Sequence, residues 1–390
     1  MLIVSGNQLV LLKNGEQYFP ALVKAIDEAR EEVFLESYIF QDDEAGSLVA
    51  GALCRAAARG VAVQLLIDGF GSRAFPVRLR KAMTDQGVRL QVFRPKVRLW
   101  QVSRARLRRM HRKLAVIDSK IGFVGGINVI DDHDTPGQTP PRFDYAVRIV
   151  GPIARDMRGA AARLWILVSL AHLGRHGVKL SSLPELHSGP WARTPAAGGR
   201  VRFVVRDSVG HRRDIENAML EGIISAHEEI LIACAYFLPG RRFRKALMEA
   251  SARGVRVVLM LQGRVEYALL HYASRALYGS LLESGVEIYE YHRSFLHAKV
   301  AVIDRRLASI GSSNIDPFSL LLAREANLFV EDHGFAAELR DSLEEAMRTG
   351  ATQLPGREWS RLPWPQRFLI WAGYALARGL TSFAGFEPYH

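Results

Sequence analysis

The sequence has only two cysteines in 390 residues, Cys54 and Cys234, which excludes a disulfide framework and any cysteine-rich zinc or iron–sulfur site. It also has no uncharged apolar run of the ~18 to 20 residues needed to cross a bilayer. The runs that come nearest span residues 164–174 and 368–377. The first residues show no basic region followed by an apolar core, so no signal peptide is expected. These absences predict a cytosolic setting in which any membrane contact is at the surface.

The composition otherwise fits a folded, basic protein. Hydrophobic residues make up 48% of the chain and charged residues 24%, which provides a large core and excludes a disordered, collagen-like or coiled-coil protein. At this length two domains are expected. The 52 Lys and Arg against 40 Asp and Glu leave a net charge of +12, which predicts an anionic partner. Composition alone leaves nucleic acid, a phospholipid surface and a phosphorylated substrate equally open.

The two halves of the chain repeat each other. Segment 29–40 (AREEVFLESYIF) matches 226–237 (AHEEILIACAYF), and 111–128 (HRKLAVIDSKIGFVGGIN) matches 297–314 (HAKVAVIDRRLASIGSSN). In both halves, helical stretches alternate with short runs of Val, Ile and Leu bounded by glycine. This alternation predicts a duplicated α/β protein with mixed, mostly parallel sheets covered by helices.

The predicted domain boundaries follow from this repeat. Arg-Gly-Val steps at Arg59 and Arg253 predict a glycine at the end of a helix, just before a strand, in each half. A stretch rich in Pro, Gly and Ser separates the halves and is interpreted as a linker. The predicted units are a first domain (1–180), a linker (181–200), a second domain (201–350) and an apolar C-terminal tail (351–390).

Each half contains the pattern His-x-Lys-x4-Asp-x6-Gly-[Gly/Ser]-x-Asn. Its members are His111, Lys113, Asp118, Gly125, Gly126 and Asn128 in the first half, and His297, Lys299, Asp304, Gly311, Ser312 and Asn314 in the second. Side chains at i and i+2 of a strand project together, so each His and Lys should lie side by side at the mouth of a buried strand. The glycine allows close backbone approach and the asparagine brings an amide donor. Two facing copies would surround one pocket with two imidazoles, two ammonium groups and two amides.

Such a pocket suits metal-free attack on a phosphodiester. The sequence shows no clustered carboxylates for magnesium and no GxxxxGK[ST] loop for a nucleotide. Two lysines can stabilise anionic oxygens, and one imidazole can act as nucleophile while the other serves as general acid and then base. The second nitrogen of each imidazole needs an acceptor, and the candidates are Asp144 and Glu325, which follow the histidines of their own halves by 33 and 28 residues. Neither a metal nor a cofactor is expected.

At this point a resemblance can be stated. The duplicated motif resembles that of the phospholipase D superfamily, and three longer stretches are similar to short bacterial cardiolipin synthases of the B type. These stretches are 235–247 (AYFLPGRRFRKAL), 295–304 (FLHAKVAVID) and 311–327 (GSSNIDPFSLLLAREAN). The resemblance implies two pseudo-symmetric phospholipase D-like α/β/α domains packed around one central active site.

The resemblance also implies a reaction, namely phosphatidyl transfer from one phosphatidylglycerol to another, which gives cardiolipin and glycerol. By analogy with two-motif relatives, His111 attacks the phosphorus while His297 protonates the departing glycerol. His297 then activates the hydroxyl of the second lipid, which attacks the phosphatidyl-histidine. The lysines and asparagines of the motif hold the phosphoryl oxygens. Asp118 and Asp304 are expected to be chiefly structural, because five residues of extended strand, ~16 Å, separate them from the lysines.

A basic insertion immediately precedes His111. Segment 94–113 (RPKVRLWQVSRARLRRMHRK) has nine basic residues and no acidic one, and it predicts a membrane-facing loop. The residues expected to contact lipid are Arg98, Trp100, Arg104, Arg106, Arg108 and Arg109. The alternative is a solvated basic face that aids solubility. The apolar tail 367–386 fits either an interfacial helix or a helix packed on the domain core.

The expected partners are therefore anionic phospholipid, phosphatidylglycerol above all, and the membrane surface. The predicted location is peripheral, on the cytoplasmic face of the cell membrane, and nucleic acid is not expected as a partner. A phospholipase D-type phosphodiesterase acting on other phospholipids or on nucleic acid is the alternative, because a basic groove with His and Lys suits either substrate. A non-enzymatic lipid-binding scaffold is disfavoured, because binding alone does not require paired histidines.

Overall fold

A computed structural model of the chain describes residues 3–94, 108–176, 198–207, 210–264, 268–316, 323–356, 372–373 and 375–376. The elements of the first half are β1 (Val4–Lys13), α1 (Asn14–Asp27), β2 (Glu32–Ser37), α2 (Glu44–Ala58), β3 (Ala62–Asp68), α3 (Val77–Asp85), β4 (Arg89–Phe93), β5 (Leu114–Ile117), β6 (Ile121–Gly125), β7 (Arg142–Phe143), β8 (Tyr145–Val150) and α5 (Ile153–His176).

The second half repeats this order of elements. They are β9 (Gly199–Arg206), α6 (Asp214–Ile224), β10 (Glu229–Cys234), α7 (Arg241–Ala252), β11 (Arg256–Gln262), α8 (Ala268–Glu283), β12 (Glu287–Tyr291), β13 (Phe295–Leu296), β14 (Lys299–Ile303), β15 (Leu307–Gly311), β16 (Glu325–Glu331), α10 (His333–Gly350) and β17 (Ala351–Gln353).

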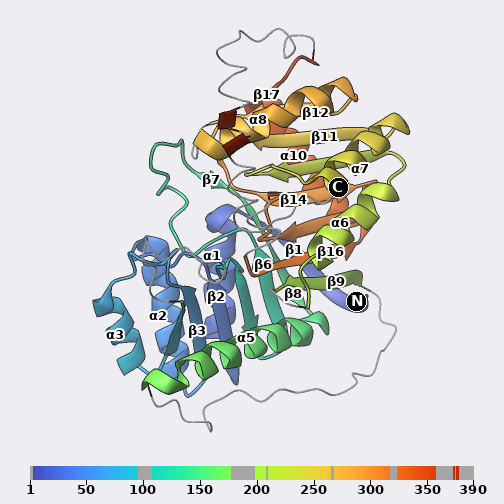
Figure 1. Ribbon diagram of the computed structural model, residues 1–390. Coiled ribbons are helices and arrows are strands. Elements are labelled where there is room, and N and C mark those ends of the chain that lie inside the picture. Colours follow the sequence, from blue (N-terminus) through green and yellow to red (C-terminus); the bar gives the residue numbers. More distant parts are fainter. Residues whose placement is uncertain are drawn as a thin grey trace.

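One sheet runs through both halves. Its fifteen strands have the order β17-β12-β11-β10-β14-β15-β16-β9-β1-β8-β6-β5-β2-β3-β4, and the antiparallel pair β1 and β9 joins the halves at the centre (Figure 1). The sheet is mixed, as predicted, but the expectation of mostly parallel pairing is wrong. Among these strands only four neighbouring pairs are parallel: β2–β3, β3–β4, β10–β11 and β11–β12.

Local turns explain part of the antiparallel strand pairing. After the motif lysine each half makes a tight hairpin, β5–β6 or β14–β15, instead of crossing over through a helix. The turn residues Asp118 and Ser119 have φ of 49° and 55°, and Asp304 and Arg305 have 50° and 49°. Two successive residues with positive φ make the type I′ turn that suits a two-residue hairpin, so the third motif residue is a turn residue.

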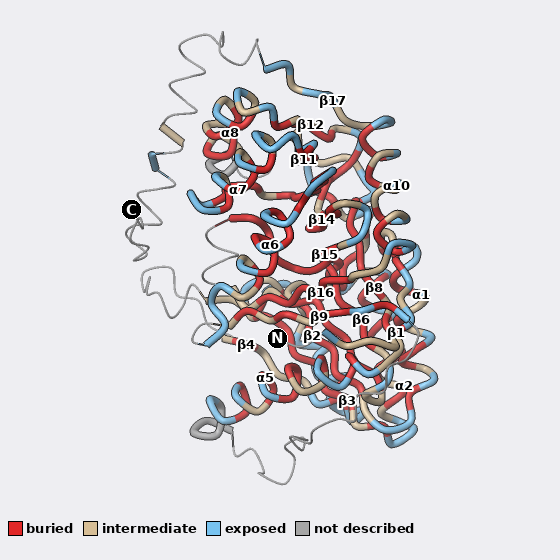
Figure 2. Tube along the Cα trace, turned by 90° about the vertical axis from the view of Figure 1, so that its right-hand side faces the viewer, coloured by how far each residue is buried: buried red, intermediate tan, exposed pale blue. Residues whose placement is uncertain are grey.

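Helices cover both faces of the sheet, which confirms the α/β/α layering (Figure 1). On one face the buried side chains of α5 and α10, such as Trp165 and Leu339, belong to a core that includes strands of both halves. On the other face α1 and α2 cover the first half, and α6, α7 and α8 cover the second, with separate cores. Figure 2 shows the buried residues concentrated along the strands. The shared core is what fixes the two halves relative to each other.

The predicted helix-end glycines can be compared with the structure. Gly60 and Gly254 follow α2 and α7 with φ of 88° and 90°, which confirms the predicted helix-end glycines. β17 pairs with the edge strand β12, so the sheet includes residues 351–353 at the start of the segment predicted to be a tail. No described helix is both long and apolar enough to span a bilayer. Most of the linker and of the apolar tail lies outside the described residues. Among the described tail residues, Gly373 lies against α8, since a Cβ added to it would be 2.9 Å from Cβ of Tyr272.

Candidate active site

Short parallel pairings bring the two motifs to the middle of the molecule. Met110 pairs with Arg324, and the amide of His111 donates to the Arg324 carbonyl at 2.9 Å. In the same way β13 pairs with β7, and the amide of His297 donates to the Phe143 carbonyl at 2.8 Å. Each motif histidine is therefore hydrogen-bonded to the other half of the chain, at the residue just before that half's buried carboxylate.

The imidazole partners are crossed between the halves. Nδ1 of His111 lies 3.0 Å from Oε1 of Glu325, and Nδ1 of His297 lies 2.6 Å from Oδ2 of Asp144. The sequence interpretation chose the correct two carboxylates, but it associated each with the histidine of its own half. That association is wrong, because the strand-end pairings place each carboxylate against the opposite motif. Because a carboxylate binds Nδ1 of each imidazole, Nε2 is the nitrogen that can react with a substrate.

Burial sets the charge state of these groups. Burial lowers the pKa of His111, although the Glu325 carboxylate opposes the effect. It lowers the pKa of His297 further, and the nearby Lys299 adds to that effect. Burial also raises the pKa of Asp144 to about 6, whereas the pKa of Glu325 is held below its usual value by His111 and Lys113 against the effect of burial. The two halves therefore present two different proton-transfer pairs.

The motif lysines are fully enclosed. Nζ of Lys113 donates to the His111 carbonyl at 2.8 Å and lies 5.3 Å above the Tyr38 ring. Nζ of Lys299 donates to the His297 carbonyl and lies 3.8 Å from the Asp144 carboxylate. Burial lowers the pKa of both lysines, most strongly for Lys113. An anion in the pocket would offset that cost, because it would neutralise ammonium groups that are otherwise removed from water.

Gly126 and Ser312 occupy equivalent positions and support the two carboxylates differently. A Cβ on Gly126 would lie 2.3 Å from Oδ1 of Asp144, so glycine is required to let that carboxylate approach. Ser312 instead donates its hydroxyl to Oε2 of Glu325, and its Oγ accepts the Ala326 amide at 3.1 Å. Thus glycine accompanies the aspartate in the first half, and serine accompanies the glutamate in the second half.

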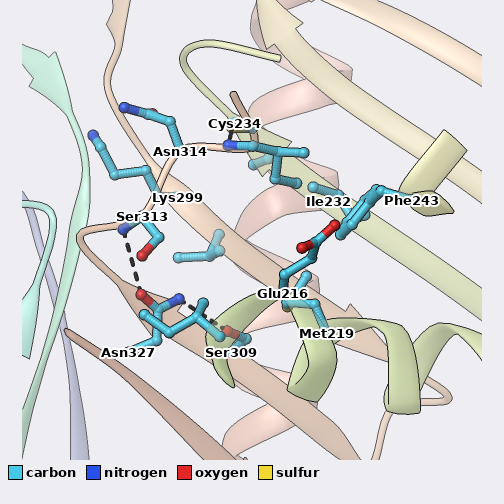
Figure 3. Close-up of a pocket in the computed structure, with 14 residues that line it drawn as sticks. Glu216, Met219, Ile232, Cys234, Phe243, Lys299, Ser309, Ser313, Asn314 and Asn327 are labelled. Carbon is cyan, nitrogen blue, oxygen red and sulfur yellow. Dashed lines mark hydrogen bonds between the residues drawn. The ribbon is translucent and has the colours of Figure 1, made fainter. Parts of the chain in front are cut away.

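Both motif asparagines are buried. Oδ1 of Asn128 accepts the Ile39 amide at 3.1 Å, which fixes the orientation of its amide group. Asn314 and Lys299 line a small cavity of ≈ 20 Å³ under the second motif, together with Ser313 and Asn327 (Figure 3). In that view the side-chain nitrogens of Lys299 and Asn314 point in the same direction, away from the cavity.

The motif aspartates do not contact the imidazoles. Each accepts hydrogen bonds from three backbone amides. Asp118 accepts the amides of Arg30, Glu31 and Glu32 at 2.9, 2.8 and 3.0 Å. Asp304 accepts the three equivalent amides, those of residues 227 to 229, at 2.9, 2.8 and 3.0 Å. These bonds join the β5–β6 and β14–β15 turns to the starts of β2 and β10. The structural role expected for both aspartates follows directly from this geometry.

The basic insertion can be followed at its C-terminal end. Arg98, Trp100, Arg104 and Arg106 lie outside the described residues. Arg108 is half-buried. Arg109 does not fit the predicted membrane contact, because its Nε donates to Asp68 at 3.0 Å and its side chain is only 15% exposed. This arginine fixes the end of the insertion to the fold instead.

Sequence reasoning missed three supporting residues. Asp68, at the end of β3, also accepts the Met110 amide at 2.9 Å, and the equivalent Gln262 accepts the Leu296 amide at 3.4 Å. Each therefore binds the backbone of the residue just before a motif histidine. The ring of Tyr38 packs edge-on against His111 at 4.8 Å between centroids. The repeat itself was the available signal, because Asp68 and Gln262 fall at equivalent positions of it.

The two motifs thus bring together two imidazoles with fixed Nδ1 atoms and two buried ammonium groups, whose charges act on one another across the halves. In the described part of the chain, no group of three His, Cys, Asp or Glu side chains is arranged to hold a metal ion. The duplicated fold and crossed His-carboxylate pairs define a phospholipase D-like protein. Comparison with known proteins makes this class more specific.

The family model described as "Cardiolipin synthase, PLD-like domain" matches residues 22–133 and 219–347. Cardiolipin synthase B of Escherichia coli (strain K12) is 39% identical over 400 residues, covering 99% of this chain and 91% of the relative. A probable cardiolipin synthase of Bacillus subtilis (strain 168) is 32% identical, covering 89% of this chain and 67% of the relative. The chain therefore belongs to the cardiolipin synthase family of phospholipase D-like proteins, which confirms the resemblance.

Solved structures agree on the fold. Phosphatidylserine synthase from Haemophilus influenzae Rd KW20 superposes with a TM-score of 0.72 at 14% identity, covering 97% of this chain and 96% of that one. Polyphosphate kinase from Porphyromonas gingivalis gives a TM-score of 0.57 at 16% identity, covering 96% of this chain and 53% of that one. At these identities the likeness supports the two-domain α/β architecture alone.

Proposed function

We propose that the chain is a phosphatidyltransferase that makes cardiolipin and glycerol from two molecules of phosphatidylglycerol. The observation that carries this proposal is the crossed pairing of His111 with Glu325 and of His297 with Asp144, which buries both imidazoles near each other. Two oriented imidazoles beside two lysines can perform both steps of a phosphoryl transfer. The family membership supplies the class of substrate.

In the first step, Nε2 of His111 attacks the phosphorus of one phosphatidylglycerol. The bond from phosphorus to the glycerol oxygen breaks, and protonated His297 gives its proton to that oxygen, so glycerol leaves. The product is a phosphatidyl-histidine. Binding of the phosphodiester anion raises the proton affinity of His297, whose pKa is low in the free pocket.

In the second step, His297 takes the proton from a hydroxyl of a second phosphatidylglycerol. That oxygen attacks the phosphorus, the bond to Nε2 of His111 breaks, and cardiolipin leaves. Lys113, Lys299, Asn128 and Asn314 stabilise the negative charge that develops on the phosphoryl oxygens. Water that reaches the same intermediate would give phosphatidic acid, so hydrolysis competes with transfer.

The proposal includes where the protein works. We place it at the cytoplasmic face of the cell membrane, held peripherally by anionic phospholipid, with the basic insertion 94–113 facing the lipid. The net charge of +12 supports this location, because a cationic surface is attracted to anionic headgroups. Binding to phosphatidylglycerol vesicles should weaken as salt rises. Chemistry within the buried pocket should change little, since buried charges are screened less.

The test uses the purified full chain with phosphatidylglycerol vesicles and EDTA, with cardiolipin and glycerol quantified by mass spectrometry. Equal amounts of the two products are expected. Folded, vesicle-bound protein that makes no cardiolipin would refute the proposal. Loss of activity with the chelator would refute the metal-free mechanism, and cleavage of DNA under the same conditions would favour a nuclease.

A further inference from the structure

Arg324 stands next to the active site but outside the pocket described above. Its amide donates to the Arg109 carbonyl at 2.8 Å, and its carbonyl accepts the His111 amide. It immediately precedes Glu325, so the two Cα atoms are about 3.8 Å apart. Successive side chains of an extended segment point to opposite sides. The Arg324 guanidinium therefore starts beside the residue that holds His111, but it points away from that imidazole.

The charge of Arg324 is balanced only at a distance, by the carboxylates of Asp207 and Glu36, which raise its pKa less than burial lowers it. Its side chain is half-buried and forms no ion pair or hydrogen bond with the residues that the structure describes. Burial and the positive charge of Arg112 lower its pKa. Arg112 itself is neutralised by Glu36, whose Oε1 accepts from Nη2 at 2.9 Å. Charged groups removed from water are normally paired, so an unpaired guanidinium here needs an explanation.

Arg94 shows the same lack of a partner. It is half-buried over the Phe93 ring, and its Nη1 is fully covered without a hydrogen-bond partner in the described part of the chain. Burial and the charges of Arg109 and Arg108 lower its pKa. The positive charge of Arg94 also lowers the pKa of Arg324. The two guanidinium groups thus form a local surplus of positive charge next to the first motif.

The other half of the molecule shows that the fold does not require this charge. The residues equivalent to Arg324, Arg112, Glu36 and Arg94 are Phe143, Ala298, Ala233 and His292. Phe143 stacks on Tyr291 at 5.4 Å, and both alanines are completely buried in the shared core. The same backbone position is therefore apolar in one half and cationic in the other. An asymmetric pair of substrates would account for that difference.

We propose that Arg324 and Arg94 form a second phosphate subsite, which binds the phosphodiester of the acceptor phospholipid while its hydroxyl attacks the phosphatidyl-histidine. This inference rests on the proposed function. Cardiolipin contains two phosphodiesters joined through one glycerol, so the acceptor brings a second anion close to the reacting phosphorus. Guanidinium groups match phosphate oxygens in geometry and charge, and they would offset the repulsion between the two phosphates.

The test separates the acceptor from the donor. Phosphatidylglycerol vesicles are supplied with ethanol, and the ratio of cardiolipin to phosphatidylethanol is measured, because ethanol is an acceptor without phosphate. Arg324→Gln and Arg94→Gln should each lower this ratio about tenfold, with phosphatidylethanol formation changed by less than about twofold. The control is Arg348→Gln, which removes an exposed arginine from α10 and should leave the ratio unchanged.

Several results would overturn the subsite. An unchanged ratio in both arginine variants would do so, and so would an equal fall of both products, which would place the arginines on the donor. Phosphatidylethanol formation that responds to added inorganic phosphate in the unmodified protein, but not in Arg324→Gln, would assign the subsite to free phosphate. Wild-type protein that makes phosphatidylethanol but no cardiolipin would refute the proposed function itself, and the lipid subsite with it.

Stability provides an independent readout. Arg324→Phe introduces the residue of the equivalent position, and it should raise the unfolding temperature while lowering the ratio, because an unpaired half-buried charge is removed. A marked fall in unfolding temperature would show that Arg324 supports the fold instead, and would contradict the subsite.

Discussion

Glu325 belongs to the second half of the chain, yet its carboxylate holds Nδ1 of His111 in the first half at 3.0 Å. Asp144 makes the reciprocal contact with His297 at 2.6 Å. Neither half alone therefore contains a complete pair of imidazole and carboxylate. The duplication gives one active site, and the central β1–β9 junction with its shared core is what keeps that site assembled.

The crossed pairs can be separated by substitution. Glu325→Gln should remove the hydrogen-bonded Nδ1 proton of His111 from the downfield proton NMR spectrum of histidine-labelled protein and leave that of His297 in place. Asp144→Asn should do the opposite. Each change should also lower turnover by at least about a hundredfold, because an imidazole without its acceptor loses its fixed orientation and tautomer. Loss of the signal from the histidine of the same half would contradict the crossed arrangement.

The pH dependence should follow Asp144. Its pKa is raised to about 6 by burial, so it becomes protonated as the pH falls through that value and can no longer stabilise a charged His297. The pKa of Glu325 is held low, so that carboxylate remains ionised over the same range. We expect kcat/KM to fall below about pH 6, measured with vesicle binding held constant. An acidic limb that persists in Asp144→Asn would contradict this assignment.

The motif aspartates should matter for stability. Asp118→Ala leaves three amides without their acceptor and should lower the free energy of unfolding by about 1–3 kcal/mol in urea denaturation. Turnover per folded molecule should change only a few-fold. Asp341→Ala, at a side chain that is 75% exposed, is the matched control. A hundredfold loss of turnover at unchanged stability would show that Asp118 acts in the chemistry.

The two carboxylate supports should respond unequally. Gly126→Ala places a methyl group 2.3 Å from Oδ1 of Asp144, which accepts the Tyr145 amide, and 2.4 Å from Oδ2, which contacts His297. The carboxylate must shift, and turnover should fall by about a hundredfold. Ser312→Ala removes one hydrogen bond to Glu325 and should cost about tenfold. Steady-state kinetics of the two purified variants decide this, and the reverse order of effects would contradict the geometry.

Much of the site could be predicted from the repeat. Two motifs at equivalent positions identified the histidines, the lysines and the asparagines, and the need for an Nδ1 acceptor identified Asp144 and Glu325. Their crossing could not be predicted, because it depends on the contact of Met110 with Arg324 and of β13 with β7. Each of these pairings joins segments that are far apart in the sequence, and nothing in the local pattern specifies the partner.

The fold was predicted correctly in its layers and wrongly in its strand directions. Alternating helices and apolar runs correctly indicated parallel pairs such as β2–β3, but the runs after the motif lysine are joined by two-residue turns. Asp118 and Ser119, both with positive φ, lie in the middle of an otherwise apolar stretch and could have indicated a hairpin. The role of Arg109 was also missed, because its partner Asp68 lies 41 residues earlier.

The proposed transfer proceeds through a covalent intermediate on His111. The most direct measurement is rapid quenching of the unmodified protein with labelled phosphatidylglycerol, followed by mapping of the phosphatidyl-histidine by mass spectrometry. We expect label on His111, and we expect that label to pass to cardiolipin when unlabelled phosphatidylglycerol is added before the quench. Label on His297 would reverse the roles of the two histidines, and cardiolipin formed without any labelled histidine would contradict the mechanism.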